Sequence, residues 1–279
     1  MDYHSDRFQD HSLLIFKDKI LEAVFPANLL DQRVYSHQGL TFGGLICNRP
    51  MSLDNLNTIM KLVIHYYKSN KIKSLYIKLI PNFFDESFFR KFEKSLQYLT
   101  AENRYNDRTM VVDLESYMIH KSKLKRFRRY ADYGFEIFKT TDFEPFWNTV
   151  LIPRLQSKHG VLPVHSLTEI QLLADQFPNN IFQYGIAKDG QWLAGITLFV
   201  HDRIVKSQYG ATTEAGEAVA ALDFLFITLI RQYESEGFRY FDMGSVRSDD
   251  PSGINQGLWK QKQELGCIEC VQPHYELQL

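Results

Sequence analysis

Gln183-Tyr-Gly-Ile-Ala-Lys-Asp-Gly-Gln-Trp-Leu-Ala-Gly195 is the stretch that decides the fold, because an earlier part of the chain repeats its plan. The earlier counterpart is Ser12-Leu-Leu-Ile-Phe-Lys-Asp-Lys-Ile-Leu-Glu-Ala-Val24, and the Lys-Asp pairs of the two stretches lie 171 positions apart. A second pair of matching residues, Ser36 and Ser207, has the same spacing of 171. Two separate matches at one spacing indicate an internal duplication.

Each copy continues with the same succession of elements. Asp-Lys and Asp-Gly between apolar runs are typical of hairpin turns, since Asp and Gly accept positive φ at low cost. A third strand, an amphipathic helix and a short apolar strand follow in both copies. The helices are predicted over 53–67 and 218–233, and the last strands over 74–80 and 240–246. We therefore expect residues 12–99 and 135–279 to superpose over these shared elements.

Composition indicates a compact protein with two cores. Apolar residues make up 44% of the 279 residues, and 21 Phe and 15 Tyr supply large side chains to fill two lobes. The net charge of −1 gives no overall attraction to nucleic acid or anionic membranes, so net charge does not indicate tRNA binding. The sequence has no long apolar run and its first residues are polar, which predicts no membrane span, no signal peptide and a cytoplasmic location.

Residue patterns for metal or redox chemistry are weak. The nine histidines form no pair at metal-ligand spacing with cysteine or carboxylate support, so no metal site is predicted. Cys267 and Cys270 have the C-x-x-C spacing, but on a strand they would face opposite sides. A redox or zinc role would need a helix start there or a second cysteine pair. Cys47 is predicted to be a core thiol.

A basic segment, Lys121–Arg129, lies between the two copies and carries six cations in nine positions. A solvated helix that joins two lobes would explain it. Alternatively, an anionic ligand at the lobe interface would relieve the repulsion among these cations. We expect the helix to end at Gly134, followed by a strand from Phe135 and by two helices between Pro145 and Phe177.

Three segments of the chain resemble motifs of the FemAB-like (Fem-type) transferases, whose fold doubles the GNAT acyltransferase arrangement. These segments are Tyr35-Ser-His-Gln-Gly-Leu-Thr-Phe-Gly-Gly44, Arg126-Phe-Arg-Arg-Tyr-Ala-Asp-Tyr-Gly-Phe135 and Gly257-Leu-Trp-Lys-Gln-Lys-Gln-Glu-Leu-Gly266. The last is similar to the family's Gly-Leu-x-x-Phe-Lys-x-x-Phe-Gly, which places Lys262 on the family lysine, whereas Gln261 and Leu265 replace the phenylalanines. The resemblance spans nearly the whole chain and implies an α/β fold, with an α+β mixed sheet, of two tandem GNAT-like lobes.

The lobes implied by this resemblance are a first GNAT-like lobe at 1–115, a basic linker helix at 116–134 and a second lobe at 135–279. Only Met1–His11 precedes the first hairpin, whereas a strand and helices precede the second. A GNAT-like lobe needs such elements to cover one sheet face and one edge. We therefore expect the first lobe to be truncated at its N-terminus, with exposed apolar surface that the second lobe or a partner chain, such as a second copy, masks.

The function implied by the resemblance is transfer of an acyl or aminoacyl group to an amine on a cell-envelope or sugar precursor. The donor would be an acyl-coenzyme A or an aminoacyl-tRNA, and the acceptor a small-molecule amine, free or nucleotide-linked. A non-catalytic GNAT-fold binding or scaffold protein is the alternative.

In the GNAT arrangement, the strand at 205–210 splays from the strand at 240–245 and leaves backbone groups free to bind the donor. A glycine in mid-strand suits such close approach. The expected donor-binding residues are Gly210, Ala211, Thr212 and Gly216. The loop lacks the Gly-rich pattern of acetyl-coenzyme A binders, and Glu214 and Glu217 are expected to repel a pyrophosphate. This argues against the usual mode of coenzyme A binding and leaves a differently placed coenzyme A or an aminoacyl-tRNA.

Acyl transfer to an amine needs a group that takes the proton. Asp242, beside the expected splay, and Tyr209, on the facing strand, are the candidate catalytic residues. Tyr209 is alternatively a core residue, and Asp242 alternatively a partner of Arg239 or Arg247. The candidate substrate-binding residues are His37, whose alternative role is structural, and, for an anionic group such as a diphosphate, Arg126, Arg128 and Lys262.

Overall fold

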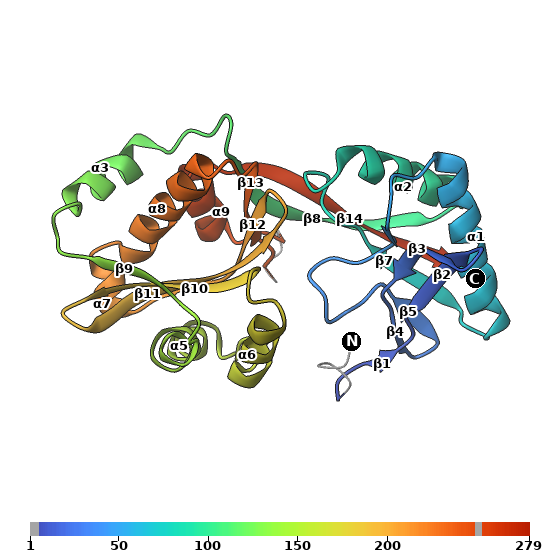
Figure 1. Ribbon diagram of the computed structural model, residues 1–279, viewed down its shortest axis with the longest axis horizontal. Helices are drawn as coiled ribbons and strands as arrows, with labels where there is room; N and C mark the ends of the chain where they lie inside the picture. The colour runs from blue at the N-terminus through green and yellow to red at the C-terminus, as the bar shows by residue number, and fades with distance from the viewer. Residues whose placement is uncertain (1–5, 249–252) are drawn as a thin grey trace. The chain divides into compact units, whose positions relative to one another are not determined.

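The computed structural model describes residues 6–248 and 253–279, and their contacts divide the chain into two compact units (Figure 1). Unit 1 comprises the chain up to Arg108 together with Cys270–Leu279, and unit 2 comprises Thr109–Glu269. Two long strands, β8 and β14, each contain a boundary between the units. The two units are described separately below.

This division differs from the lobes expected at 1–115, 116–134 and 135–279. The basic segment belongs to unit 2, and most of the last strand belongs to unit 1. The cause is strand pairing, because His274–Gln278 pairs in antiparallel register with Ser74–Lys78 of the first lobe. A strand contributed from the far end of the chain carries no local signal of its partner, so the sequence pattern assigned it to the second lobe.

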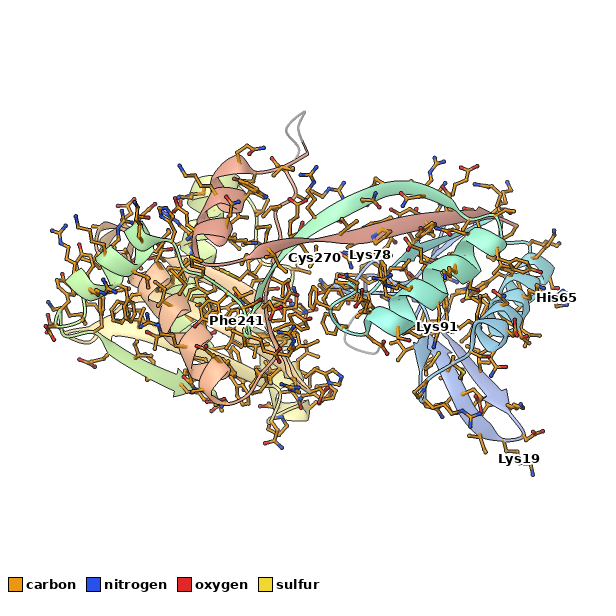
Figure 2. All side chains as sticks on the ribbon, turned by 90° about the horizontal axis from the view of Figure 1, so that it is seen from above. Lys19, His65, Lys78, Lys91, Phe241 and Cys270 are labelled. Atoms are coloured by element: carbon orange, nitrogen blue, oxygen red, sulfur yellow. The ribbon has the colours of Figure 1, made fainter. Side chains whose placement is uncertain are left out.

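Unit 1 has a main sheet in the order β1-β4-β5-β7-β14, a small sheet in the order β2-β3-β6, and two helices. The main-sheet strands are β1 (Gln9–Asp10), β4 (Asn28–Leu30), β5 (Arg33–Tyr35), β7 (Ser74–Lys78) and β14 (Ile268–Gln278). The other elements are β2 (Leu13–Lys17), β3 (Ile20–Phe25), β6 (Ile46–Cys47), α1 (Leu53–Ser69) and α2 (Glu86–Tyr98). Figure 2 shows Lys19 at the far end of the β2–β3 hairpin, which projects from the rest of unit 1. The prediction about the start of the chain falls in part on residues outside the described ranges.

The core of unit 1 lies between the helices and one face of its sheets. The apolar stripe of α1 is buried through Leu56, Met60 and Val63, against Leu75 and Ile77 of β7. Ser52 caps α1 by accepting a hydrogen bond from the backbone N–H of Asn55, which satisfies one of the free donors of the first turn. The predicted helix over 53–67 and the strand over 74–80 are thus confirmed within two residues.

Unit 2 is built on a mixed sheet in the order β8-β13-β12-β11-β10-β9. Its strands are the Thr109–Asp113 part of β8 (Glu102–Asp113), β9 (Glu136–Thr140), β10 (Ile181–Lys188), β11 (Gln191–His201), β12 (Ile204–Thr212) and β13 (Tyr240–Ser245). All neighbouring pairs are antiparallel except β12 and β13, which are parallel. The helix between β12 and β13 makes this parallel connection, as a crossover requires.

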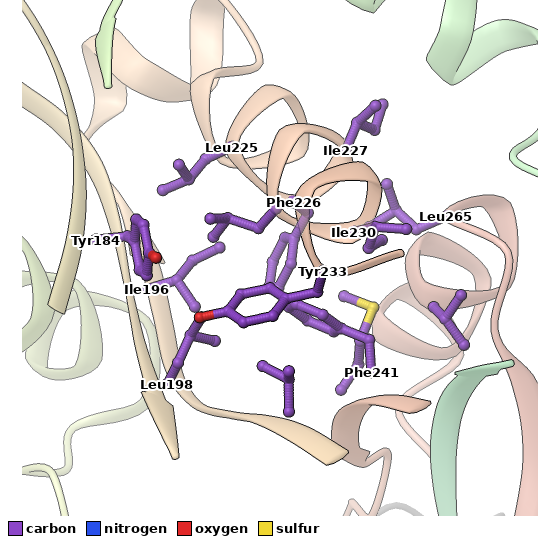
Figure 3. Close-up of a cluster of buried hydrophobic side chains, with 14 of the residues drawn as sticks. Tyr184, Ile196, Leu198, Leu225, Phe226, Ile227, Ile230, Tyr233, Phe241 and Leu265 are labelled. Carbon is purple, nitrogen blue, oxygen red and sulfur yellow. The ribbon is translucent and has the colours of Figure 1, made fainter. Parts of the chain in front are cut away.

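Helices cover both faces of the unit 2 sheet, with α5 and α6 on one side and α3 and α8 on the other (Figure 1). The helical segments are α3 (Lys121–Arg129), α4 (Glu144–Phe146), the π-helical η2 (Trp147–Leu151), α5 (Ile152–His159), α6 (Leu167–Gln176), α7 (Glu214–Ala218), α8 (Ala221–Ser235) and α9 (Gln256–Glu264). Figure 3 shows the core beneath α8, where Phe226, Ile230 and Tyr233 pack with Ile196 and Phe241 of the sheet.

Two predicted helix boundaries are wrong. The helix expected from 218 begins at Ala221, because Ala220 has a left-handed φ of 53° that separates it from the short α7. The basic helix ends at Arg129, before Gly134, and the backbone N–H of Tyr130 closes its last turn. The first boundary was set by apolar periodicity and the second by the glycine at 134, and neither signal fixes a helix end to the residue.

The two units share the turn geometry that the duplication predicts. Asp18 and Asp189 open hairpin turns with φ of 49° and 50°, and Asp31 and Asp202 open the next turns with φ of 48° and 51°. Both pairs keep the spacing of 171 found in the sequence. Left-handed aspartates at four matched positions follow from the tolerance of Asp for this conformation.

The copies diverge at one proline. β11 runs without interruption through Gln191–His201, with a bulge in its pairing with β12 at Thr197. The equivalent stretch of unit 1 is broken at Pro26 into β3 and β4, which belong to different sheets. Proline cannot donate a ladder hydrogen bond, so the strand ends where its counterpart only bulges. The expected superposition therefore does not extend to the first hairpin, which leaves the main sheet.

Candidate functional site

The site in unit 2 begins where β12 and β13 part. The two strands pair only over Ile204–Lys206 and Tyr240–Asp242. Beyond that point β12 continues along β11, whereas β13 bulges after Asp242 and continues along β8. Gly244, with φ of +77°, provides the left-handed position that this bulge needs. The backbone of β12 from Ser207 onward is therefore not paired with β13, as the resemblance to the GNAT arrangement implied.

A buried charge pair lies at the point where β12 and β13 part. Asp242 is fully buried, and its Oδ2 accepts a hydrogen bond from Nζ of Lys206 at 3.0 Å. Its Oδ1 accepts from the backbone N–H of Gly244 at 2.7 Å and from Thr109 Oγ1 at 3.3 Å. These three donors satisfy the hydrogen-bonding needs of the buried carboxylate. The anticipated alternative partner, Arg239, instead binds Asp113.

Lys262 of α9 joins this cluster from the end of β13. Its Nζ donates to the backbone carbonyls of Gly244 at 3.1 Å and Ser245 at 2.8 Å. Burial lowers the pKa of Lys262 to about 8, and the repulsion from Lys206 acts in the same direction, whereas Asp242 opposes it. Lys262 is thus a buried amine poised near physiological pH. The expected role of Lys262, binding of an anionic group such as a diphosphate, stays a prediction, and in the structure its side chain is buried.

Tyr209 lies in a separate contact cluster, toward η2 and the segment before α6. Its hydroxyl accepts from the backbone N–H of His165 at 3.0 Å and shares a hydrogen bond with His165 Nδ1 at 2.6 Å. The ring meets Trp147 edge-on at 5.2 Å between centroids. His165 is buried and was missed by the sequence analysis, since nothing in its local pattern indicates a partner on a distant strand.

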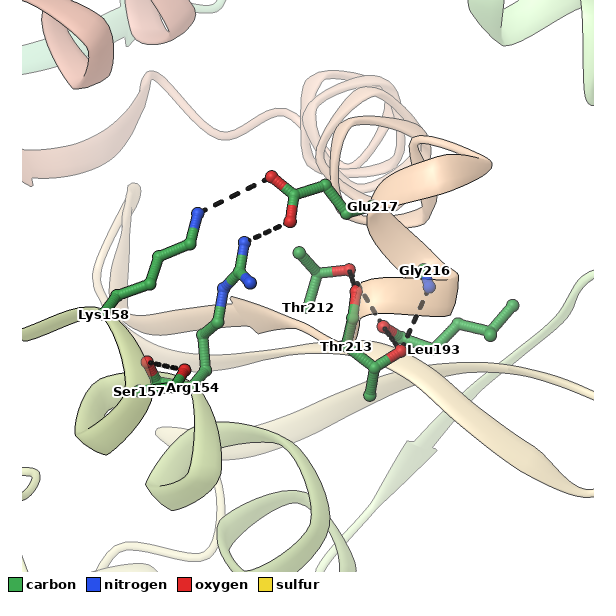
Figure 4. Close-up of polar contacts among 8 residues, drawn as sticks. All are labelled: Arg154, Ser157, Lys158, Leu193, Thr212, Thr213, Gly216 and Glu217. Atoms are coloured by element: carbon green, nitrogen blue, oxygen red, sulfur yellow. Dashed lines mark hydrogen bonds and ion pairs between the residues drawn. The ribbon is translucent and has the colours of Figure 1, made fainter.

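The four expected donor-binding residues, Gly210, Ala211, Thr212 and Gly216, differ in exposure and in the contacts that they make. Gly210 is exposed in mid-strand, whereas Ala211 and Thr212 are buried. Thr212 donates its hydroxyl to the carbonyl of Leu193, as Figure 4 shows. Gly216 lies so close to that same carbonyl that a Cβ would come within 2.1 Å of the oxygen. Close backbone packing therefore accounts for Gly216, and Gly210 is the residue of this set that is open to a ligand.

Glu217, which we expect to repel a pyrophosphate, has two cationic neighbours. Glu217 is ion-paired with Arg154 and, at 3.6 Å, with Lys158, both from α5 (Figure 4). The hydrogen bond from Arg154 lowers the pKa of Glu217, and the charges of Arg154 and Lys158 add to this. Arg154 and Lys158 therefore offset the charge of Glu217, whereas Glu214 on the same short helix has no ion pair among the described residues.

The positive charge of the basic helix α3 is partly compensated by acidic side chains. Lys123 is buried and pairs with Asp223 of α8 at 2.6 Å and with Glu264 of α9 at 3.7 Å. Arg126 and Arg128 are exposed, and neither has an ion-pair partner among the residues that the structure describes. The helix is therefore anchored by one lysine and presents free arginines to solvent.

His37 belongs to unit 1 and lies in the loop after β5. It is buried, its Nδ1 accepts from the backbone N–H of Gly39 at 3.0 Å, and its ring meets Phe8 edge-on. These contacts support the structural alternative for this histidine.

Unit 1 also holds a polar relay that the sequence analysis missed. The ring of His274 on β14 is hydrogen-bonded at Nδ1 to the hydroxyl of Tyr76 and at Nε2 to Asp107, both at 3.0 Å. Tyr105 stacks on the imidazole at 4.2 Å, and His274 is 3% exposed. Both ring nitrogens of this buried histidine therefore have a hydrogen-bond partner. The three residues come from strands that are distant in sequence, which explains why no motif revealed them.

Metal binding has no support in the described residues, among which no group of three His, Cys, Asp or Glu side chains is placed to hold an ion. Likewise, no helix within the described ranges has the length and apolar character of a membrane span.

Comparison with known proteins gives similarity in fold at low sequence identity. No protein-family model matches the chain, and no curated protein matches it in sequence. FemX is 11% identical with a TM-score of 0.71, over 99% of this chain and 90% of FemX. The C-terminal domain of a putative lysylphosphatidylglycerol synthetase from Agrobacterium fabrum is 9% identical with a TM-score of 0.66, over 96% and 84% of the two chains. A tandem GNAT protein from the clavulanic acid biosynthesis pathway is 9% identical with a TM-score of 0.52, over 96% and 82%.

These similarities confirm the fold. The chain has the α/β, mixed-sheet arrangement of FemX and of tandem GNAT proteins, and the match extends over nearly its whole length. At these identities the likeness concerns fold alone, so the activity has to be argued from the residues of the site.

Proposed function

We propose that this protein is an N-acyltransferase or aminoacyltransferase that moves an acyl group onto an amine of a cell-envelope or sugar precursor in the cytoplasm. The observation that carries the proposal is the parting of β12 and β13 above the cluster of Lys206, Asp242 and Lys262. Strand backbone that is no longer paired with β13, next to a buried charge cluster, suits acyl transfer. The backbone orients the donor, and preorganised charges stabilise the transition state.

The reaction requires movement of one proton. The acceptor nitrogen forms a bond to the donor carbonyl carbon, the bond to the leaving group breaks, and the nitrogen loses a proton that finally reaches the leaving group. Lys262 is the group that we assign to proton transfer, because a pKa of about 8 leaves part of its population neutral near physiological pH. Asp242 is hydrogen-bonded to Lys206 and acts by fixing the arrangement of the cluster.

The donor is an acyl-coenzyme A or an aminoacyl-tRNA, both of which bring phosphates. Gly210 leaves room for the donor arm beside β12. Arg154 and Lys158 supply cations next to the donor loop, where donor phosphates compete with Glu217 for them. If Glu217 keeps Arg154 and Lys158 occupied, these cations do not hold the donor phosphates. The two ion pairs then favour a second candidate function, that of a non-catalytic binding protein.

The acceptor is a small-molecule amine that carries an anionic group. Arg126 and Arg128 are exposed on α3, and arginine forks match the geometry of phosphate oxygens. A nucleotide-linked precursor would provide such a group together with an amine.

Ligand-induced stabilisation combined with product analysis tests the proposal. The protein should melt at higher temperature with acyl-coenzyme A species or aminoacyl-tRNA, since a ligand at 100 times its Kd adds about 2.7 kcal/mol to the free energy of unfolding. Mass spectrometry should then detect acylated amine after addition of nucleotide-sugar acceptors, and Lys262→Met should abolish the product while donor binding persists. Stabilisation by donor without any product would favour the binding protein, and no stabilisation by any donor would refute the proposal.

A further inference from the structure

The β2–β3 hairpin of unit 1 exposes large apolar side chains that the fold does not use. Its tip, Phe16–Leu21, is exposed at every position. The large apolar side chains with the greatest exposure on the small sheet are Leu14 at 62%, Ile20 at 60%, Phe16 at 57%, Ile46 at 48% and Leu21 at 37%. An apolar patch of this kind on an otherwise well-packed protein marks an interaction surface.

The fold explains only the opposite face of this sheet. Leu13 and Ile15 point toward the core of unit 1, where Ala23 and Phe25 of β3 are buried. A sheet with one face on the core normally alternates apolar and polar residues along each strand. Here β2 is apolar on both faces until Lys17, so the outer face is apolar for a reason other than folding.

The charged residues around the patch indicate what kind of partner it binds. Lys17 and Lys19 flank Asp18 at the tip, and the acidic Glu22 behind it is already paired with Arg49. Apolar side chains with adjacent lysines match the boundary of an anionic lipid layer, where acyl chains lie below phosphate groups. A second copy would instead bring a surface with the same two lysines, and the exposed parts of five side chains fall short of the about 800 Å² per partner of a stable protein interface.

We propose that the β2–β3 hairpin is a membrane-docking element. Phe16, Ile20 and Leu21 enter the interfacial region of an anionic bilayer, and Lys17 and Lys19 contact lipid phosphates. The hairpin projects with Lys19 at its end, which allows the tip to reach a flat surface (Figure 2). Attachment is peripheral and reversible, because a few side chains bury far less apolar area than an acyl chain or a spanning helix. This inference is independent of the proposed enzymatic function.

Vesicle co-sedimentation of the full chain tests the proposal. The protein should pellet with vesicles of phosphatidylglycerol and phosphatidylcholine and be largely released when phosphatidylcholine is the only lipid or when salt is raised. Phe16→Ser combined with Ile20→Ser should lower the partition coefficient at least about tenfold, since each buried side chain of this size contributes that much. Lys17→Gln combined with Lys19→Gln should lower it by roughly thirtyfold on anionic vesicles only, because each lysine near such a surface contributes about 1 kcal/mol.

A matched control comes from unit 2, where Leu162 and Val164 are each 63% exposed. Leu162→Ser combined with Val164→Ser should leave vesicle binding unchanged, and all variants should keep the wild-type melting temperature because the substituted side chains are exposed. Equal loss of binding in the control and hairpin variants would overturn the proposal. So would a wild-type protein that stays in the supernatant at every lipid composition, or one that is dimeric by light scattering and becomes monomeric on Phe16→Ser.

Discussion

Nζ of Lys206 lies 3.0 Å from Oδ2 of Asp242 at the last residue pair that joins β12 to β13. Asp242 is fully buried and the Lys206 side chain is 12% exposed, so both charges are largely removed from water. Such a pair gains little net stability, yet loss of one partner leaves an uncompensated buried charge. The pair therefore fixes the point where the strands part more than it stabilises the fold.

Asp242→Asn should lower the free energy of unfolding by about 3 kcal/mol, because Lys206 and Lys262 would then lose the buried carboxylate of Asp242. Urea denaturation followed by circular dichroism measures this change. The double variant Asp242→Asn with Lys206→Met should recover much of the loss, since it removes the orphaned cation. Equal destabilisation of the single and double variants would contradict this account of the pair.

Lys262 should make stability rise with pH in the alkaline range. Burial lowers its folded-state pKa to about 8 from the ordinary value of 10.5, so the unfolded chain binds more protons between these values. Stability contributed by this group is therefore lowest below pH 8 and rises up to about pH 10.5, by about 3 kcal/mol in total. The difference in unfolding free energy between wild type and Lys262→Met, measured from pH 7 to 10, should show this rise. A difference independent of pH would mean that Lys262 keeps its ordinary pKa.

Glu217→Gln should increase affinity for phosphates. The substitution frees Arg154 and Lys158 for an anionic ligand, and it should change stability by less than about 1 kcal/mol because the pair is partly solvated. Titration calorimetry with pyrophosphate and coenzyme A measures the effect. Glu214→Gln is the matched control, since Glu214 is exposed on the same short helix and has no ion pair among the described residues. Equal affinities for the two variants would show that Glu217 does not compete with ligands.

The sequence predicted those parts of the fold that depend on local chemistry. The stripe of α1 and the turns opened by Asp18 and Asp189 follow from residues close together in the chain, whereas the parting of β12 from β13 was implied by the resemblance to the GNAT arrangement. Pro26 also carried a signal, since a proline where the other copy has Thr197 predicts a broken strand.

Local sequence patterns could not predict which charged residues pair with one another. Lys206 and Asp242 are brought together only by the parallel pairing of their strands, and Lys262 arrives from a helix after both. Lys123 looks equivalent to its neighbours in the basic segment, yet it is the one that α8 buries. Tertiary packing decides which member of a charge run is paired, and a single sequence does not display it.

Tyr76→Phe should lower the free energy of unfolding by about 1–2 kcal/mol, because Nδ1 of the buried His274 would lose its hydrogen-bond partner. Tyr35→Phe is the matched control on the neighbouring strand, since its hydroxyl accepts only a long, exposed bond of 3.4 Å from Arg33. Thermal or urea denaturation compares the two. Equal and small losses would show that the relay around His274 does not depend on Tyr76.

Arg128→Glu should abolish binding of the anionic acceptor with little change in stability. Arg128 is exposed, and no ion pair ties it to the described residues, so its replacement disturbs no packing. A reversed charge would repel a diphosphate that the exposed arginines of α3 attract, and the loss should exceed that of Arg128→Gln. Titration with a nucleotide-sugar, monitored by calorimetry, measures the affinity, and Lys61→Glu on α1 of unit 1 controls for the change in net charge. Unchanged binding in Arg128→Glu would leave α3 as a solvated helix whose single buried lysine serves only to anchor it.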